Sequence, residues 1–140
     1  MESTSTQIQD HFEQLASGKR QELIALYNLV SEELPIATQS FFDGRNEEGK
    51  VVTHPTIGFG ETTLHYANGK TRTTFRIGIC ATGSGLTVHI LGLADKNFLN
   101  NFLGSRLGKA KITGYAIAFK KLSDVNEEVL RELIQKVRTM

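Results

Sequence analysis

The sequence predicts a single α+β domain over residues 1–140, in which an antiparallel β-meander of four to six strands packs with an N-terminal helix pair and with C-terminal helices. Three observations predict this class: apolar residues recur at helical spacing up to residue 34, alternate with a period of two from 56 to 91, and return to helical spacing after 97. Of the 140 residues, 39% are hydrophobic and 22% charged, which suits one core and excludes global disorder.

Two helices are expected at the start of the chain. Apolar residues recur at helical spacing over 8–16 and again over 23–34, and Ser17-Gly18 separates the two stripes. Pro35 ends the second helix, because its ring disfavours helical geometry in the residue before it.

Three polar or glycine-rich segments are expected to be irregular. Residues 1–6 are predicted to form a flexible N-terminus, and residues 43–50 a polar, solvated loop. Gly58-Phe59-Gly60 is predicted to be a bend that precedes the meander.

Two tight turns are expected to fix the register of the meander. Asn68-Gly69 is typical of a two-residue type I′ turn, and Gly83-Ser84 of a type II′ turn. The predicted pairs are His65–Arg72 and Thr63–Thr74 at the first turn, with Glu61 facing Arg76, and Ile77–Ile90, Ile79–Val88 and Gly78–His89 at the second.

Both registers place the apolar side chains of the meander on one face, whereas a slip of one residue would divide them. This face is predicted to contain Leu64, Phe75, Ile77 and Val88. Further elements are expected as a helix over 98–107, a fourth strand over 115–119 and a last helix that begins near Ser123-Asp124.

The opposite face of the meander is predicted to be polar, and Gly78 beside His89 is expected to leave an open patch on it. Guanidinium, imidazole and hydroxyl groups there would bind a carboxylate or a phosphate through charge-assisted hydrogen bonds. The alternative is an ordinary solvent-facing side of an antiparallel sheet. The candidate ligand-binding residues on this face are His65, Arg72, Thr74, Arg76 and His89.

The net charge of +1 hides an asymmetry along the chain. Between residues 50 and 123, ten Lys and Arg residues face only Glu61 and Asp95, whereas the first 48 residues are acidic. One interpretation is that acidic helices complement a basic sheet; the other is that the basic middle attracts an anionic small molecule or protein segment.

Other function classes receive little support from the sequence. No apolar run approaches the roughly 20 residues of a membrane span, and the polar start lacks a signal-peptide pattern, so we expect a cytoplasmic protein. Cys80 alone can form no internal disulfide, and neither a nucleophile–base pair nor a metal-ligand pattern is recognisable, so no catalytic residue, metal or cofactor is predicted. Scattered lysines make nucleic acid an improbable partner, while an exposed edge strand would allow a homodimer.

Several motifs resemble a known family. They are Ile57-Gly58-Phe59-Gly60, the hairpin around Asn68-Gly69, Leu86-Thr87-Val88-His89-Ile90, and the run from Leu107-Gly108-Lys109 through Phe119-Lys120-Lys121-Leu122 to Leu130-Arg131-Glu132-Leu133-Ile134. In order and spacing, over residues 56–137, they resemble the YdhG-like domain family (domain of unknown function 1801). The resemblance implies an α+β fold of helices and a meandering sheet, without an established reaction.

Some bacterial members of that family are described as frataxin-like intracellular iron chaperones. The resemblance therefore implies an alternative function in iron handling, for which carboxylates on the N-terminal helices would be the ligands. These carboxylates are Asp10, Glu13, Glu22, Glu32 and Glu33.

Overall fold

The computed structural model describes residues 3–46, 48–51 and 53–140, and within them the α+β class is confirmed. One antiparallel sheet has the strand order β1-β2-β5-β6-β8-β7, and β3 pairs only with β4 in a separate hairpin. The strands are β1 (Gln39–Phe42), β2 (Thr56–Phe59), β3 (Thr62–His65), β4 (Thr71–Thr74), β5 (Ile77–Thr82), β6 (Gly85–Ile90), β7 (Lys111–Ile112) and β8 (Ala116–Phe119).

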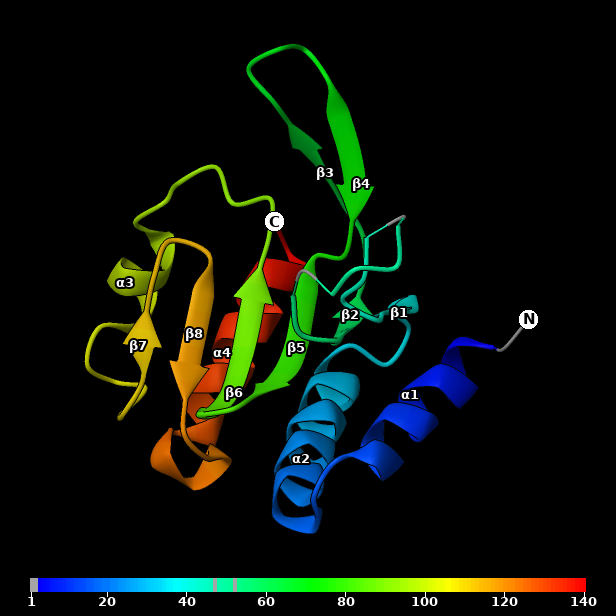
Figure 1. Cartoon of the computed structure of the whole chain (residues 1–140). Helices are drawn as coiled ribbons and strands as arrows, with labels where there is room; N and C mark the ends of the chain where they lie inside the picture. The colour runs from blue at the N-terminus through cyan, green and yellow to red at the C-terminus, as the bar shows by residue number, and fades with distance from the viewer. Residues whose placement is uncertain (1–2, 47, 52) are drawn as a thin grey trace.

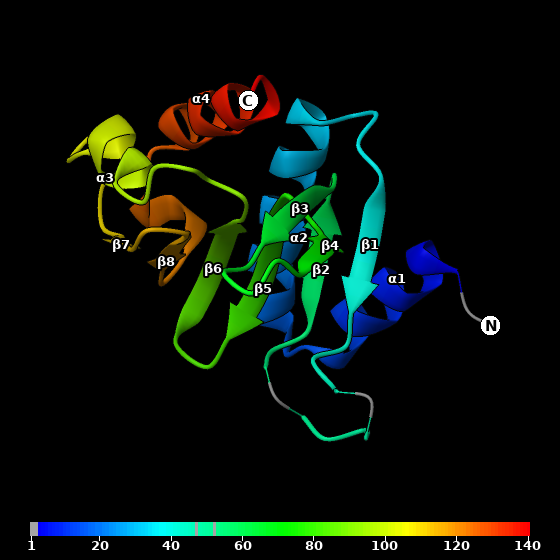
Figure 2. The ribbon, with the colours of Figure 1, turned by 90° about the horizontal axis from the view of Figure 1, so that it is seen from above.

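Helices cover one face of this sheet (Figures 1 and 2). α2 and α4 lie on the same face and contact each other, α3 lies beside α4, and α1 lies beside β1 at the sheet edge. None of the described helices is long and apolar enough to cross a membrane. The helices are α1 (Thr4–Gln14), α2 (Ser17–Glu33), α3 (Phe98–Leu103) and α4 (Glu127–Arg138), with a 3₁₀ turn over Leu122–Asp124.

The core lies between these helices and the sheet. Each fully buried Leu or Ile there stabilises the folded state by about 1.5–3 kcal/mol relative to an exposed one. A salt bridge at the edge of the core joins α2 and α4. Arg131 of α4 donates to Glu33 Oε2 of α2 at 2.9 Å. The completely buried side chains include Leu23, Leu26 and Val30 of α2, Leu130, Leu133 and Ile134 of α4, and Ile79, Val88 and Ile117 of the sheet.

The register of the second predicted hairpin is confirmed, but its turn is not of the expected type II′, because Gly83 lacks the positive φ that this type requires at its first central residue. β5 and β6 pair Ile77 with Ile90 and Gly78 with His89, so the register around Gly83-Ser84 is the expected one. Ile77 and Ile79 of β5 and Val88 and Ile90 of β6 are buried on the face that the helices cover, as the alternation predicted.

The predicted register of the first hairpin is wrong by one residue. Leu64 pairs with Arg72 and His65 with Thr71, because the loop holds three residues rather than two. Tyr66 N–H donates to Lys70 O at 2.9 Å, and Gly69 N–H donates to Tyr66 O at 3.0 Å. Gly69 has φ +84°, which fits a turn followed by a left-handed bulge residue.

The predicted three-stranded meander is also wrong, since residues 71–82 do not form one strand. β4 ends at Thr74, the chain bends at Phe75-Arg76, and β5 begins at Ile77. β2 takes the place beside β5 that the meander gave to β3. Gly58 and Phe59, which were expected in a bend, belong to the buried strand β2, and the bend lies at Gly60, directly after it. Arg76 N–H donates to Phe59 O, not to the expected partner Glu61.

The bend moves Phe75 to the face opposite the core. A Cβ built on Gly78 would lie 2.3 Å from Phe75 Cε1, whereas Ile77 and Ile79 on either side of Gly78 point into the core. Leu64 is half-buried and lies outside the core. The prediction that Leu64 and Phe75 share the face of Ile77 and Val88 is therefore wrong.

Smaller differences concern the ends of elements. Ser3 caps α1 and the helix begins at Thr4, within the segment 1–6 that the sequence predicts to be a flexible terminus; residues 1–2 lie outside the described residues. The last helix begins at Glu127, where the Asn126 side chain accepts from Glu128 N–H and Val129 N–H, rather than at 123–124. The 43–50 segment is irregular in its described residues, position 47 lying outside them, and one bridge joins Arg45 to Val51. The sequence did not predict β1.

Candidate functional site

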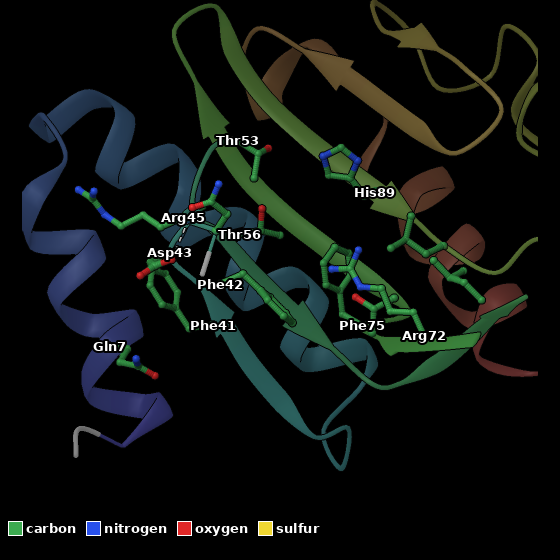
Figure 3. Close-up of a pocket in the computed structure, with 15 residues that line it drawn as sticks. Gln7, Phe41, Phe42, Asp43, Arg45, Thr53, Thr56, Arg72, Phe75 and His89 are labelled. Carbon is green, nitrogen blue, oxygen red and sulfur yellow. Dashed lines mark hydrogen bonds between the residues drawn. The ribbon is translucent and has the colours of Figure 1, made fainter. Parts of the chain in front are cut away.

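A cavity of about 640 Å³ lies on the sheet face that α2 and α4 leave uncovered. The β3–β4 hairpin bounds one side of it and the chain that follows β1 bounds the other, with β6 contributing the remaining wall (Figure 3). Its lining is Gln7, Phe41, Phe42, Asp43, Gly44, Arg45, Asn46, Thr53, Thr56, Leu64, Arg72, Thr74, Phe75, His89 and Leu91.

Two aromatic rings form the apolar part of this cavity. The ring centroids of Phe42 and Phe75 are 5.3 Å apart, with the ring planes tilted by 58°. The Phe75 side chain lies over Gly58 and Gly78, which face each other across β2 and β5, and it fills the space that two absent side chains leave. The patch that was expected to be open beside His89 is therefore occupied, and Phe75 has a fixed seat on the sheet.

Arg72 is the basic side chain of the hairpin that reaches the cavity. It extends from β4 toward the space that Thr56 and His89 also border (Figure 3). Arg72 is exposed and takes part in none of the ion pairs formed among the described residues. Thr74, one pleat further along β4, is 6% exposed and lines the same cavity.

The opposite wall carries a second arginine that is already engaged. Arg45 Nη1 donates to Gly49 O at 2.8 Å, and the Arg45 backbone N–H donates to Asp43 Oδ1 at 2.9 Å. These hydrogen bonds of Asp43 and Arg45 stabilise the loop that both residues belong to.

His89 stands on β6 between the cavity and a buried thiol. Its Nε2 lies 3.8 Å from Cys80 Sγ, and its ring stacks on Tyr115 with centroids 6.2 Å apart. Burial lowers the pKa of His89 below 6.5. Burial also raises the pKa of the Cys80 thiol, against hydrogen bonds with Thr87 and Thr56 that lower it. Both groups are therefore neutral at pH 7, and the pair is not an activated thiolate–imidazolium pair.

The structure brings together three of the five predicted site residues. Arg72, Thr74 and His89 line one cavity, whereas His65 is exposed on the hairpin and is not part of its described lining. Arg76 lies at a separate cavity of about 450 Å³. The prediction that His65 and Arg76 belong to the same surface as Arg72 and His89 is corrected by the shifted register and the bend at Phe75.

Arg76 has a structural role at the base of the hairpin. Its Nη1 donates to Leu91 O at 2.8 Å and lies 3.5 Å from Thr62 Oγ1, so it ties β3 to the end of β6. Burial lowers the pKa of its guanidinium. Gly92 leaves room for this contact, since a Cβ there would lie 2.6 Å from Arg76 Nη1.

Sequence reasoning missed the aromatic half of the site. Phe42 lies in the unpredicted β1, and Phe75 was assigned to the core because it continues the alternation of β5. The only signal available was the pair of glycines at 58 and 78, and their apposition is a long-range pairing that no local pattern shows.

Three acidic residues of α2 already have hydrogen-bond or ion-pair partners within the chain. Glu32 and Glu33 both pair with Arg131, and Glu22 Oε2 accepts from Leu122 N–H at 3.1 Å. Among the described residues, no group of three or more His, Cys, Asp or Glu side chains is placed to hold a metal ion. The iron-handling alternative stays a prediction from the resemblance alone.

Comparison with family models, with curated proteins and with solved structures finds no match to this chain. The resemblance to the YdhG-like domain family accordingly stays a sequence-based prediction, and the geometry of the site carries the functional argument.

Proposed function

We propose that this chain is a binding module that holds a small anionic molecule in the cavity between the β3–β4 hairpin and the sheet. The observation that carries the proposal is Arg72, a guanidinium at the cavity without an ion-pair partner among the described residues. A hydrogen bond from a charged donor is about twice as strong as a neutral one, so an anion would gain most at this side chain.

The surrounding groups support an anion rather than a cation. The Thr74 hydroxyl can donate to an oxyanion, and His89 can donate through one ring nitrogen while neutral, whereas Thr56 Oγ1 already donates to His54 O at 3.1 Å. Asp43 is the one acidic residue of the described lining, and its Oδ1 accepts from the Arg45 backbone N–H. The excess of basic residues between 50 and 123 adds a long-range attraction.

Binding is favoured over catalysis because the nearest candidate nucleophile is inactive. Cys80 is 3% exposed, and burial raises its pKa. A buried neutral thiol beside a neutral imidazole is a poor nucleophile at pH 7. We therefore propose that the cavity binds its ligand without catalysing a reaction.

A thermal-shift experiment tests this function. Sodium acetate, benzoate, succinate and phosphate are each added against sodium chloride of equal ionic strength, with wild type and Arg72→Gln in parallel. A ligand at about 100 times its Kd adds about 2.7 kcal/mol to the free energy of unfolding, so the expected result is a rise of several degrees in Tm for at least one anion.

Arg72→Gln is expected to lose that rise while keeping the Tm of the free protein. Lys70→Gln is the matched control, because it removes one exposed charge from the same hairpin without touching the cavity. The proposal fails if no anion raises the Tm, or if the rise is the same in Arg72→Gln.

A further inference from the structure

The composition of the cavity points to a narrower class of ligand. We propose that the site takes an aromatic monocarboxylate, whose ring lies against Phe42 and Phe75 and whose carboxylate binds Arg72. This inference rests on the proposed anion-binding function and adds to it the apolar half of the ligand.

The apolar half follows from the side chains that line the cavity. Five of the lining side chains are apolar. Phe42 and Phe75 are only half-buried, so part of each ring is accessible to a ligand. A third ring placed beside two tilted rings gains edge-to-face or offset contact, about 0.5–1.5 kcal/mol beyond the burial of its area. The five are Phe41, Phe42, Leu64, Phe75 and Leu91.

This aromatic surface is preorganised. Phe75 cannot retreat into the sheet, because the backbones of Gly58 and Gly78 already lie against its side chain. Phe42 is held on the paired strand β1, opposite Thr56 of β2. A ligand ring therefore meets side chains that lose little freedom on binding, which lowers the entropic cost.

The charge of the ligand follows from the number of free cations. The described lining contains two arginines, Arg45 and Arg72. Arg45 Nη1 donates to Gly49 O in its own loop, which leaves the Arg72 guanidinium to bind a ligand. His89 is neutral at pH 7 because burial lowers its pKa. One guanidinium matches one planar carboxylate through two parallel hydrogen bonds, whereas a dianionic phosphate would keep a charge uncompensated.

The size of the cavity agrees with such a molecule. Small-molecule sites occupy about 300–1,000 Å³, and this cavity of about 640 Å³ lies within that range. Within the cavity, the apolar contacts come from Phe42 of β1 and from Phe75, which follows β4, and the charge comes from Arg72 of β4.

Three probes separate the two halves of the ligand. Naphthalene-2-carboxylate carries both, naphthalene-2-methanol only the ring, and acetate only the charge. Each is titrated into the ¹⁵N-labelled full chain, and Kd is taken from the amide shifts. Naphthalene-2-carboxylate is expected to bind at least tenfold tighter than naphthalene-2-methanol or acetate. The largest amide chemical-shift changes are expected around Thr56, Phe75 and Leu91.

Variants then assign each half to its side chains. Arg72→Gln is expected to weaken naphthalene-2-carboxylate at least tenfold and to leave naphthalene-2-methanol unchanged, while Lys70→Gln changes neither. Phe42→Leu, which keeps an apolar side chain on β1, is expected to weaken naphthalene-2-carboxylate at least threefold and to leave acetate unchanged.

The failures of the two proposals are distinguishable. If acetate binds as tightly as naphthalene-2-carboxylate and both need Arg72, the aromatic inference is overturned and anion binding stands. If naphthalene-2-methanol binds as tightly as the carboxylate, or Arg72→Gln has no effect, anion binding is overturned as well. Absence of any shift with naphthalene-2-carboxylate up to 10 mM overturns the aromatic inference, and the thermal-shift panel then decides the wider proposal.

Discussion

The ring of Phe75 lies in the space that a side chain at Gly78 would occupy. A Cβ built on Gly78 would be 2.3 Å from Phe75 Cε1 and 2.7 Å from Phe75 Cζ. Gly58 faces Gly78 across the strand pair, and a Cβ there would lie 2.6 Å from Phe75 Cβ. This contact fixes the aromatic floor of the cavity and the point at which the hairpin leaves the sheet.

Gly78→Ala is expected to lower the free energy of unfolding by about 1–3 kcal/mol, the usual cost of overpacking a site that cannot yield. Urea denaturation followed by circular dichroism measures it. The control is Gly83→Ala, because a Cβ on Gly83 meets nothing within 4 Å. Equal stability of the two variants would contradict the placement of Phe75.

Arg72 and Arg76 are expected to separate function from stability. Arg76→Gln removes a charged donor from Leu91 O and Thr62 Oγ1, which costs about 1.5–3 kcal/mol of unfolding free energy. Arg72→Gln is expected to change stability by less than about 0.5 kcal/mol, since it removes an exposed side chain. Urea denaturation of both variants checks this, and a reversed order would show that the hairpin base has been misassigned.

Stability is expected to fall as the pH drops below 6.5. Burial lowers the pKa of His11 and of His89 from 6.5, so the unfolded chain binds more protons than the folded one. Their contribution is complete above pH 6.5 and is lost as the pH falls through 6.5 toward the lowered values. His11 Nε2 is buried without a hydrogen-bond partner among the described residues, so an imidazolium there would be uncompensated.

Urea denaturation at pH 7.5, 6.5 and 5.5 measures this dependence. His11→Gln and His89→Gln are each expected to flatten it. A slope that neither buried variant alters would assign the pH dependence to other groups.

Asn126→Ala is expected to destabilise the chain by about 1 kcal/mol, the usual cost of losing an N-cap. The Asn126 side chain accepts from two backbone N–H groups at the start of α4. Ser123→Ala is the comparison, because Ser123 is exposed and lies where the sequence had placed the start of this helix. Thermal unfolding of both variants distinguishes the two positions, and a larger loss for Ser123→Ala would favour the earlier start.

The sequence predicted the part of the sheet in which pattern and turn agree. Ile77 pairs with Ile90 as expected, because a slip there would turn buried side chains toward solvent. The first hairpin lies outside the core, so no such penalty selects its register, and Leu64 is only half-buried. Asn68-Gly69 is compatible with a two-residue or a three-residue loop, and the local hydrogen bonds of Tyr66 decide for the longer one.

The site was predicted in part for the same reason. Thr74 and His89 were found because they alternate with core residues, and Arg72 because it lies on the same strand as Thr74. The bend at Phe75-Arg76 could not be predicted, since it depends on Gly58 and Gly78 meeting across two strands that are 20 positions apart in the chain. Long-range apposition of small residues decides where the aromatic side chain goes.

The hairpin stands apart from the six-stranded sheet of the described residues, which gives the two halves of the cavity different stabilities (Figure 1). A two-stranded hairpin is marginally stable by itself in water, while Phe75 sits on the best-paired part of the fold. We expect fraying of the hairpin to withdraw the Arg72 guanidinium, while Phe75 stays over Gly58 and Gly78. A ligand that contacts both Arg72 and Phe75 would hold the hairpin against the sheet. Amide hydrogen exchange of residues 62–74 would then be slower in the complex than in the free chain.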